Sequence, residues 1–231
     1  MPQVCIVCLV LGELGNDPAE STVPAVDPLN LNQVILAEGK TQVSTTYKSE
    51  YKNPNSFKNP KVLAEAAIFT ALATALSTIV VYVMPQGGSI TLASMVPIIW
   101  LALRRGPKVG IVTGVIYGCI QFAMLPYIAP VSDVSVAVIQ VLLDYPIAFG
   151  VLGLAGFFPR YPAVGAAVGV SMRFVMSFIS GAFIWAPIYA PGIDPYIYSS
   201  VYNGSYLLPE LCITVFAVFL LQASKALKAY L

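Results

Sequence analysis

The sequence predicts an all-α membrane protein with six transmembrane helices. Apolar residues make up 58% of the 231-residue chain and charged residues only 10%, whereas about a quarter of the residues are charged in an ordinary soluble domain. From residue 61 onward the sequence consists of long apolar runs separated by short breaks. Basic residues recur in alternate breaks, as they do when a chain crosses a membrane repeatedly.

Six segments fit this description, at about 62–84, 90–104, 107–124, 134–158, 163–186 and 205–228. Most approach the length that crosses a hydrocarbon core of about 30 Å at about 1.5 Å per residue. The second is short and carries Pro97. We expect it to start inside the membrane from a loop tucked into the protein, where its backbone groups can find partners.

The basic residues predict the orientation. They lie before the first segment, between the second and third, between the fourth and fifth, and at the end of the last: Lys58, Lys61, Arg104, Arg105, Lys108, Arg160, Lys225 and Lys228. The breaks near 85–89, 125–133 and 187–204 carry no Lys or Arg. The positive-inside rule then puts both termini in the cytoplasm of a multi-pass protein of the cell (plasma) membrane, and an odd number of spans would scatter the charges over both faces.

Residues 1–60 differ in kind from the six-helix membrane domain at 61–231. They hold more than half of the acidic residues and many Pro, Asn, Ser and Thr residues. The apolar run "VCIVCLVLG" at 4–12 is too short to span a bilayer. We expect 1–60 to form a poorly ordered, irregular extension. "EGKT" at 38–41 lacks the glycine that a phosphate loop needs at position 34, so no ATPase is expected on this chain.

Composition also excludes several functions. The chain has no histidine, which excludes His-based metal sites and Ser-His or Cys-His catalysis, and its net charge of +1 gives no reason to expect nucleic acid. Cys5 and Cys8 have CxxC spacing but no second pair, and Cys119 and Cys212 lie in apolar runs, so we expect ordinary thiols. No enzyme activity, metal or cofactor is predicted.

Two stripes of small residues suggest close helix packing. Gly106, Gly110, Gly114 and Gly118 recur every four residues, as do Ala67, Ala71 and Ala75. Small residues at this spacing let another helix approach. We expect the glycines to pack internally, whereas the alanines could face a helix of the same chain or a separate membrane subunit.

Three charged residues interrupt the apolar runs: Asp144, Arg173 and Glu210. A charge at the bilayer centre costs about 2.5–3.5 kcal/mol on insertion scales, so each is a functional candidate. Gln140 shares the helical face of Asp144 one turn before it, and Ser177, Gly181 and Trp185 continue the stripe that starts at Arg173. The loop expected before the last helix supplies further polar and aromatic residues, namely Tyr196, Tyr198, Tyr202, Asn203 and Tyr206.

Two interpretations of these residues stay open. In the first, Asp144 pairs with Arg173 and the aromatic residues form an interfacial belt. In the second, Asp144, Gln140, Asn203 and Tyr198 line a cavity beneath the last outer loop. A carboxylate, an amide with both a donor and an acceptor, and flat aromatic faces such as Trp185 would suit a small, flat, cationic heterocycle.

Three blocks of the sequence resemble the energy-coupled thiamin transporter family. They are "MPQGGSITLASMVPIIWLALRRGPKVGIVTGVIYG" at 84–118, "VIQVLLDYPIAFGVLGLAG" at 138–156 and "YSSVYNGSYLLPE" at 198–210. Members are substrate-binding S components of energy-coupling factor (ECF) vitamin transporters. The resemblance covers about 61–231.

The resemblance implies a six-helix S-component fold that binds one thiamin near the outer face, with the loop after the first helix helping to close the site. It also implies docking on an ECF transmembrane scaffold subunit driven by two ATPase subunits, with Ala67, Ala71 and Ala75 as the docking surface. The residues that match the family's site are Asp144, Tyr145, Tyr198, Asn203, Gly181, Trp185 and Arg173.

The chain departs from the family pattern at two places. Ser177 stands where members often carry histidine, and Gly87 and Gly88 stand where some carry tryptophan. Tyr82, Tyr127 or Trp185 could replace the lost ring contacts. Two alternatives stay open: an S component for another small vitamin or precursor, and an ion-coupled secondary transporter that uses Asp144 and Glu210.

Overall fold

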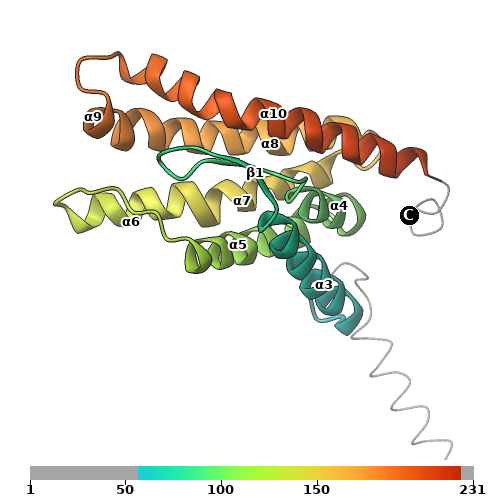
Figure 1. Ribbon diagram of the computed structural model, residues 1–231. Helices are drawn as coiled ribbons and strands as arrows, with labels where there is room; N and C mark the ends of the chain where they lie inside the picture. The colour runs from blue at the N-terminus through green and yellow to red at the C-terminus, as the bar shows by residue number, and fades with distance from the viewer. Residues whose placement is uncertain (1–56, 225–231) are drawn as a thin grey trace, which may run out of the picture. The chain divides into compact units, whose positions relative to one another are not determined.

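The computed structural model describes residues 57–224, and this part is mostly helical (Figure 1). The expected extension at 1–60 lies outside the described residues except for its last four, as do Lys225 and Lys228. In chain order the elements are α3 (Pro60–Ser77), β1 (Val80–Val83), β2 (Ser89–Thr91), α4 (Val96–Arg105), α5 (Pro107–Met124), α6 (Val134–Leu142), η1 (Leu143–Ile147), α7 (Ala148–Gly150), η2 (Val151–Phe157), α8 (Pro162–Ser180), η3 (Gly181–Trp185), α9 (Ala186–Tyr189) and α10 (Pro195–Ala223).

The helices form two packed pairs with a hairpin between them. α8 and α10 run side by side, and α5 lies along the continuous helical stretch from α6 to η2 (Figure 1). β1 and β2 pair antiparallel, and their hairpin lies between the two pairs in this view. It is this hairpin that brings residues 80–91 next to the middle of the bundle.

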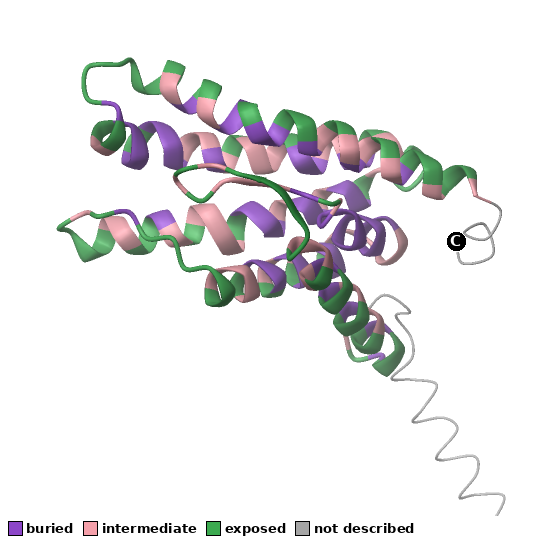
Figure 2. Ribbon diagram, viewed as in Figure 1, coloured by how far each residue is buried: buried purple, intermediate pink, exposed green. Residues whose placement is uncertain are grey.

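The short helix α4 is the most buried element of the described part. Every residue from Val96 to Leu103 is buried (Figure 2), and Ile98, Ile99, Trp100 and Leu103 belong to the largest core cluster. The segment predicted at 90–104 was expected to start from a loop tucked into the protein, and the burial of α4 agrees with that expectation.

Five helices of the described part are long and apolar enough to cross a membrane: Pro60–Ser77, Pro107–Met124, Val134–Phe157, Pro162–Tyr189 and Pro195–Ala223. α4, with ten residues, is not among them. Many of their large apolar side chains are exposed, such as Ile68, Leu125, Phe183 and Leu208. This is the pattern of helices whose outer faces meet lipid rather than water.

The first predicted helix was too long. It ends at Ser77, and the residues expected to continue it to 84 form β1. The run Thr78 to Val81 is β-branched throughout, which disfavours helix and favours strand. The turn that follows uses Gly87, whose φ of 89° suits glycine. The second segment likewise begins with β2, and its helix starts at Val96 rather than 90.

The last helix begins ten residues earlier than predicted. Asp194 caps it by accepting hydrogen bonds from the backbone N–H groups of Tyr196 and Ile197, and Pro195 occupies the first turn. Both are helix-start signals that the polar, tyrosine-rich composition of 196–206 concealed. Tyr198 and Asn203 therefore project from α10 and not from a loop.

The glycine stripe packs internally, as expected. A Cβ at Gly114 would meet the backbone of Phe149 and Gly150, and one at Gly118 would meet Tyr145 and Pro146. α5 thus lies in close backbone contact with the helical stretch that carries Asp144. Gly106 is different, because it ends α4 with a φ of 89° and has open space around it.

Candidate functional site

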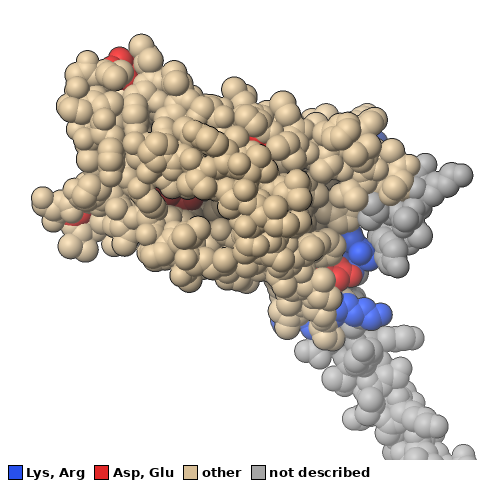
Figure 3. All heavy atoms as spheres, in the orientation of Figure 1, with Lys and Arg blue, Asp and Glu red and all other residues tan. Residues whose placement is uncertain are grey.

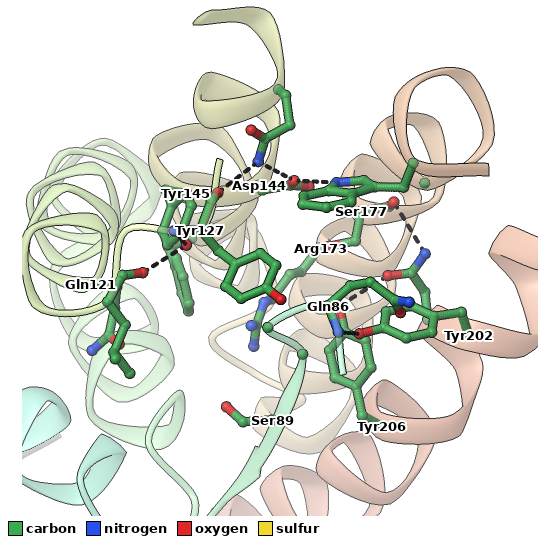
Figure 4. Close-up of a pocket in the computed structure, with 18 of the residues that line it drawn as sticks. Gln86, Ser89, Gln121, Tyr127, Asp144, Tyr145, Arg173, Ser177, Tyr202 and Tyr206 are labelled. Carbon is green, nitrogen blue, oxygen red and sulfur yellow. Dashed lines mark hydrogen bonds between the residues drawn. The ribbon is translucent and has the colours of Figure 1, made fainter. Parts of the chain in front are cut away.

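One cavity brings together all nine residues that the sequence singled out for ligand binding. Its wall includes Gln140, Asp144, Tyr145, Arg173, Ser177, Gly181, Trp185, Tyr198 and Asn203. They come from α6, η1, α8, η3 and α10. The hairpin, the end of α5 and the segment after it also contribute to the wall, with Gln86, Gly87, Gly88, Ser89, Gln121, Leu125 and Tyr127 (Figure 4). Phe149, Tyr202 and Tyr206 complete the lining. Figure 3 shows acidic atoms inside a hollow on the face it displays.

Asp144 is the acidic residue of this wall within the described part. Its Oδ2 accepts one hydrogen bond from Gln140 Nε2 at 2.8 Å and another from Trp185 Nε1 at 3.0 Å (Figure 4). Both bonds reach the same oxygen, Oδ2, and the Ser180 hydroxyl also lies close to this carboxylate. Two bonds through Oδ2 therefore fix the carboxylate in the cavity wall, where a ligand can reach it.

Arg173 does not pair with Asp144, so that interpretation was wrong. Its Nη1 lies 3.0 Å from Glu210 Oε2 and 2.8 Å from Met95 Sδ. Its guanidinium also lies over the Phe149 ring, 4.3 Å from the centroid. Because Arg173 pairs with Glu210, Asp144 has no ion-pair partner among the described residues.

Two wide helical turns shape the cavity. Asp144 and Tyr145 lie on the π-helical turn η1, which contains Pro146. Gly181 and Trp185 are the first and last residues of the π-helical turn η3. Proline lacks the N–H that an α-helix would use, and single π turns are frequent at functional sites. The two turns face each other through the bond from Trp185 to Asp144.

Aromatic rings cover two sides of the cavity. Tyr127 and Trp185 lie 5.8 Å apart between centroids with an interplanar angle of 38°. Tyr198 and Tyr202 stack at 5.9 Å and 13°. Flat faces of this kind bind planar rings and organic cations. Tyr82, in contrast, lies on β1 with 57% of its surface exposed and is not part of the wall.

Asn203 lines the cavity and is oriented by hydrogen bonds within the protein. Its amide nitrogen donates to the carbonyl oxygens of Ser177 and Ser199, and its oxygen accepts from the hydroxyl of Tyr206 at 2.9 Å. Because both carbonyls are acceptors, the amide can lie only this way round. A Cβ at Gly181 would lie 2.7 Å from Asn203 Nδ2, so this glycine allows η3 to approach α10.

Tyr145 and Gln140 both anchor the segment after α5. The Tyr145 hydroxyl accepts from the backbone N–H of Tyr127 at 2.9 Å and donates to the carbonyl of Leu125 at 2.8 Å. Gln140 Oε1 accepts from the N–H of Ala129 at 3.1 Å. These bonds place the Tyr127 ring at the cavity.

Three polar atoms of the wall are buried with no partner among the described residues: Gln86 Oε1, Arg173 Nε and the Tyr198 hydroxyl. Buried polar atoms are usually hydrogen-bonded. Together they offer an acceptor, a donor and a group that can do both. The wall thus suits a polar ligand with a cationic or donor edge near Asp144 and an acceptor near Arg173. The described residues hold no cluster of three or more potential metal-ligating side chains.

A family model described as "Thiamine transporter protein (Thia_YuaJ)" matches residues 63–229. The chain belongs to this family. The match covers the membrane part and confirms the resemblance drawn from the three sequence blocks. Membership of a transporter family also supports the expectation that this chain is a transport protein and not an enzyme.

Two relatives of this family member are informative. The thiamine transporter ThiT of Bacillus subtilis (strain 168) is 37% identical over 106 residues, which cover 45% of this chain and 52% of that protein. The match thus spans about half the length of the curated relative. The structure of ThiT from Listeria monocytogenes superposes with a TM-score of 0.61 at 23% identity, covering 73% of this chain and 98% of that one. This second likeness supports a shared fold.

Sequence reasoning missed the hairpin residues in this family member. Gln86 and Ser89 were predicted only to lie in a loop without basic residues, and Tyr206 in the loop before the last helix, whereas all three line the cavity. The signal that could have found the hairpin is the β-branched run before Pro85 and the Gly-Gly pair at 87–88. Phe149 and Gln121 carried no signal, because each lies on an otherwise ordinary helix.

Proposed function

We propose that this chain is the thiamin-binding membrane subunit, or S component, of an ATP-driven ECF vitamin uptake transporter. The observation that carries the proposal is the geometry at Asp144: a carboxylate fixed through Oδ2 by Gln140 and Trp185 in the wall of the cavity. Family membership supports the same substrate.

Thiamin fits the chemistry of the wall. It carries a fixed positive charge and an exocyclic amino group, and Asp144 supplies one negative charge. The carboxylate accepts from the amino group, and the charge of the thiazolium is balanced without a permanent internal cation. Arg173 Nε and the Tyr198 hydroxyl meet acceptor atoms of the ligand, which would satisfy buried groups that the protein leaves unpaired.

Tyr127 replaces the ring contacts that the family pattern places elsewhere. Its ring lies beside Trp185, and its hydroxyl donates to the carbonyl of Pro85 at 2.7 Å. Ser177, at the position where members often carry histidine, supplies its carbonyl oxygen to Asn203. Stacking between a ligand ring and the Tyr127–Trp185 pair follows from this arrangement.

The chain lies in the cell membrane with α4 as a sixth, short segment enclosed by the others. On the face shown in Figure 3 the basic residues gather toward one end, where one acidic side chain lies among them, and further acidic atoms lie at the opposite end. The basic residues that flank the helices are Lys58, Lys61, Arg104, Arg105, Lys108 and Arg160, and we assign them to the basic end. The positive-inside rule makes it the cytoplasmic end, with both termini inside.

The partners are a membrane scaffold subunit and two ATPase subunits. Ala67, Ala71 and Ala75 are exposed on α3 beside Ile68 and Leu72, which are also exposed. This face therefore packs against nothing in the described part of the chain. A helix of the scaffold subunit can approach it closely because the three alanines leave a smooth surface.

Tryptophan fluorescence tests the substrate. Trp185 lies in the cavity, whereas Trp100 is buried in α4 and gives a constant background. Titration of the purified protein with thiamin should quench the emission to saturation, and riboflavin should not compete. Saturation by riboflavin but not thiamin would assign another vitamin. Uptake of thiamin by liposomes that contain this chain alone would instead indicate an ion-coupled secondary transporter.

A further inference from the structure

One stripe of α10 holds the hairpin along its whole length. The hydroxyl of Tyr202 accepts from the backbone N–H of Gln86 at 3.0 Å. One turn along α10, the Tyr206 ring lies so close to Gly88 that a Cβ there would come within 2.7 Å of it. One turn further, Glu210 Oε1 accepts from the N–H and the hydroxyl of Thr91.

The two ends of the hairpin are held with different strength. We call Thr91, at the end of β2, the root of the hairpin, and the turn at residues 85–88 its tip. At the root, Glu210 accepts hydrogen bonds from Thr91 N at 2.9 Å and from Thr91 Oγ1 at 2.6 Å. The hydroxyl groups of Thr91 and Ser94 also form a hydrogen bond of 2.6 Å with each other. Hydrogen bonds to a buried carboxylate are stronger than neutral ones. The tip depends on neutral bonds from Gln86 to Tyr202 and from Tyr127 to Pro85. The tip can therefore open while the root stays fixed.

Glu210 also reaches the cavity through Arg173. Its second oxygen, Oε2, accepts from Arg173 Nη1, whose side chain lines the cavity and has the unpaired Nε. Only 3% of the Glu210 side chain is exposed. Such a carboxylate is stable only when both its oxygens keep their donors. Movement of the hairpin root and movement of Arg173 are therefore coupled through one group.

We infer that Glu210 is a positioning residue that fixes the root of the hairpin as a hinge and sets Arg173 against the same ligand that the hairpin covers. The inference rests on the proposed function for the identity of that ligand. A ligand that contacts Arg173 favours the position of Glu210 that holds Thr91, and a closed hairpin in turn retains the ligand, because coupling between two sites is reciprocal.

The test removes one of the two bonds between Thr91 and Glu210 without changing a residue of the cavity wall. Thr91→Val deletes the hydroxyl but keeps the size of the side chain, and Thr91 does not line the cavity. Thr91→Ser restores the hydroxyl. Thr214→Val is the matched control, because Thr214 lies one turn beyond Glu210 on α10 and its buried hydroxyl has no partner among the described residues. Hydrogen exchange is measured without ligand, and thiamin association and dissociation by stopped-flow tryptophan fluorescence.

Thr91→Val should raise exchange at 79–92 by about tenfold and raise the thiamin dissociation rate by a similar factor, with association changed less than about twofold. Thr91→Ser should restore both, and Thr214→Val should change neither. Unchanged hairpin exchange would overturn the inference, and so would faster exchange spread over α8 and α10, or faster hairpin exchange with wild-type dissociation.

Failure of the substrate assignment gives a different result. If the wild-type protein binds no thiamin, the proposed function fails. The exchange measurement without ligand then still decides whether Glu210 holds the hairpin root.

Discussion

Trp185 donates a hydrogen bond of 3.0 Å from its indole nitrogen to Asp144 Oδ2, across 41 residues of sequence and between two π-helical turns. Gln140 donates to the same oxygen. The carboxylate is thereby aimed at the cavity without an internal cation. This arrangement explains how an acid persists in an apolar run: neutral donors hold it, and we propose that the ligand completes its pairing.

The charge of Asp144 can be removed with little change of shape. Asp144→Asn should weaken thiamin binding by at least about a hundredfold, because it deletes the charge that balances the thiazolium and turns an acceptor pair into a mixed donor and acceptor. Isothermal titration in detergent measures the dissociation constant. Asp133→Asn is the control, since Asp133 caps α6 outside the cavity and asparagine caps equally well. Equal affinities of the two variants would contradict the role of Asp144.

The indole of Trp185 has two separable contributions. Trp185→Phe keeps a flat ring beside Tyr127 but removes the donor to Asp144. We expect about a tenfold loss of thiamin affinity, whereas Trp185→Ala should lose clearly more because the stacking face goes as well. Because both variants lack the fluorophore, titration calorimetry measures the binding. A loss no greater for alanine than for phenylalanine would exclude stacking at this position.

Gly181 allows η3 to approach α10. Gly181→Ala would press a methyl group against Asn203 and Ser199, and overpacking of this kind costs about 1–3 kcal/mol. We expect a lower melting temperature and weaker thiamin binding. Gly204→Ala is the matched control, because its Cβ would meet only Leu208 at 3.8 Å and alanine favours the helix. A Gly181→Ala protein as stable as the Gly204→Ala protein would show that the contact can relax.

The buried pair of Arg173 and Glu210 should behave asymmetrically. Arg173→Met leaves Glu210 as a buried charge without its cation, which costs about 3–5 kcal/mol. Adding Glu210→Gln should recover part of this loss, because the remaining amide oxygen can still accept from Thr91. Thermal unfolding in detergent measures both, with Arg160→Met as an exposed control. A double variant less stable than the single one would contradict this assignment of charge.

The exposed alanines of α3 can be blocked. Ala71→Trp should prevent assembly with the ECF scaffold and ATPase subunits, and uptake in cells, yet leave thiamin binding within about twofold, because the residue faces away from the bundle. Leu208→Trp, at an exposed position of α10, is the control, and it should leave assembly, uptake and thiamin binding unchanged. Lost binding with retained assembly would mean that the two faces of the protein are reversed.

The sequence by itself determined the membrane class, the helical pattern and the identity of the main polar residues. Low charge and long apolar runs depend only on local composition, and the alternation of basic breaks depends only on order along the chain. The segment at 107–124 is a helix with the predicted bounds because proline starts it and its glycines meet backbone on the neighbouring helix. Asp144 could be singled out since a lone acid in an apolar run is costly.

Tertiary structure alone decided which of these residues meet. Arg173 pairs with Glu210 and not Asp144, a choice set by the packing of α8 against α10 that no spacing in the sequence expresses. Asn203 on α10 is oriented by the carbonyl of Ser177 on α8, again through a contact between helices. The hairpin at 80–91 has no apolar periodicity strong enough to outweigh the helical runs around it. Its β-branched run favours strand, and one face of α10 holds it in place: Tyr202 and Glu210 accept from its backbone N–H groups, and the Tyr206 ring lies against Gly88.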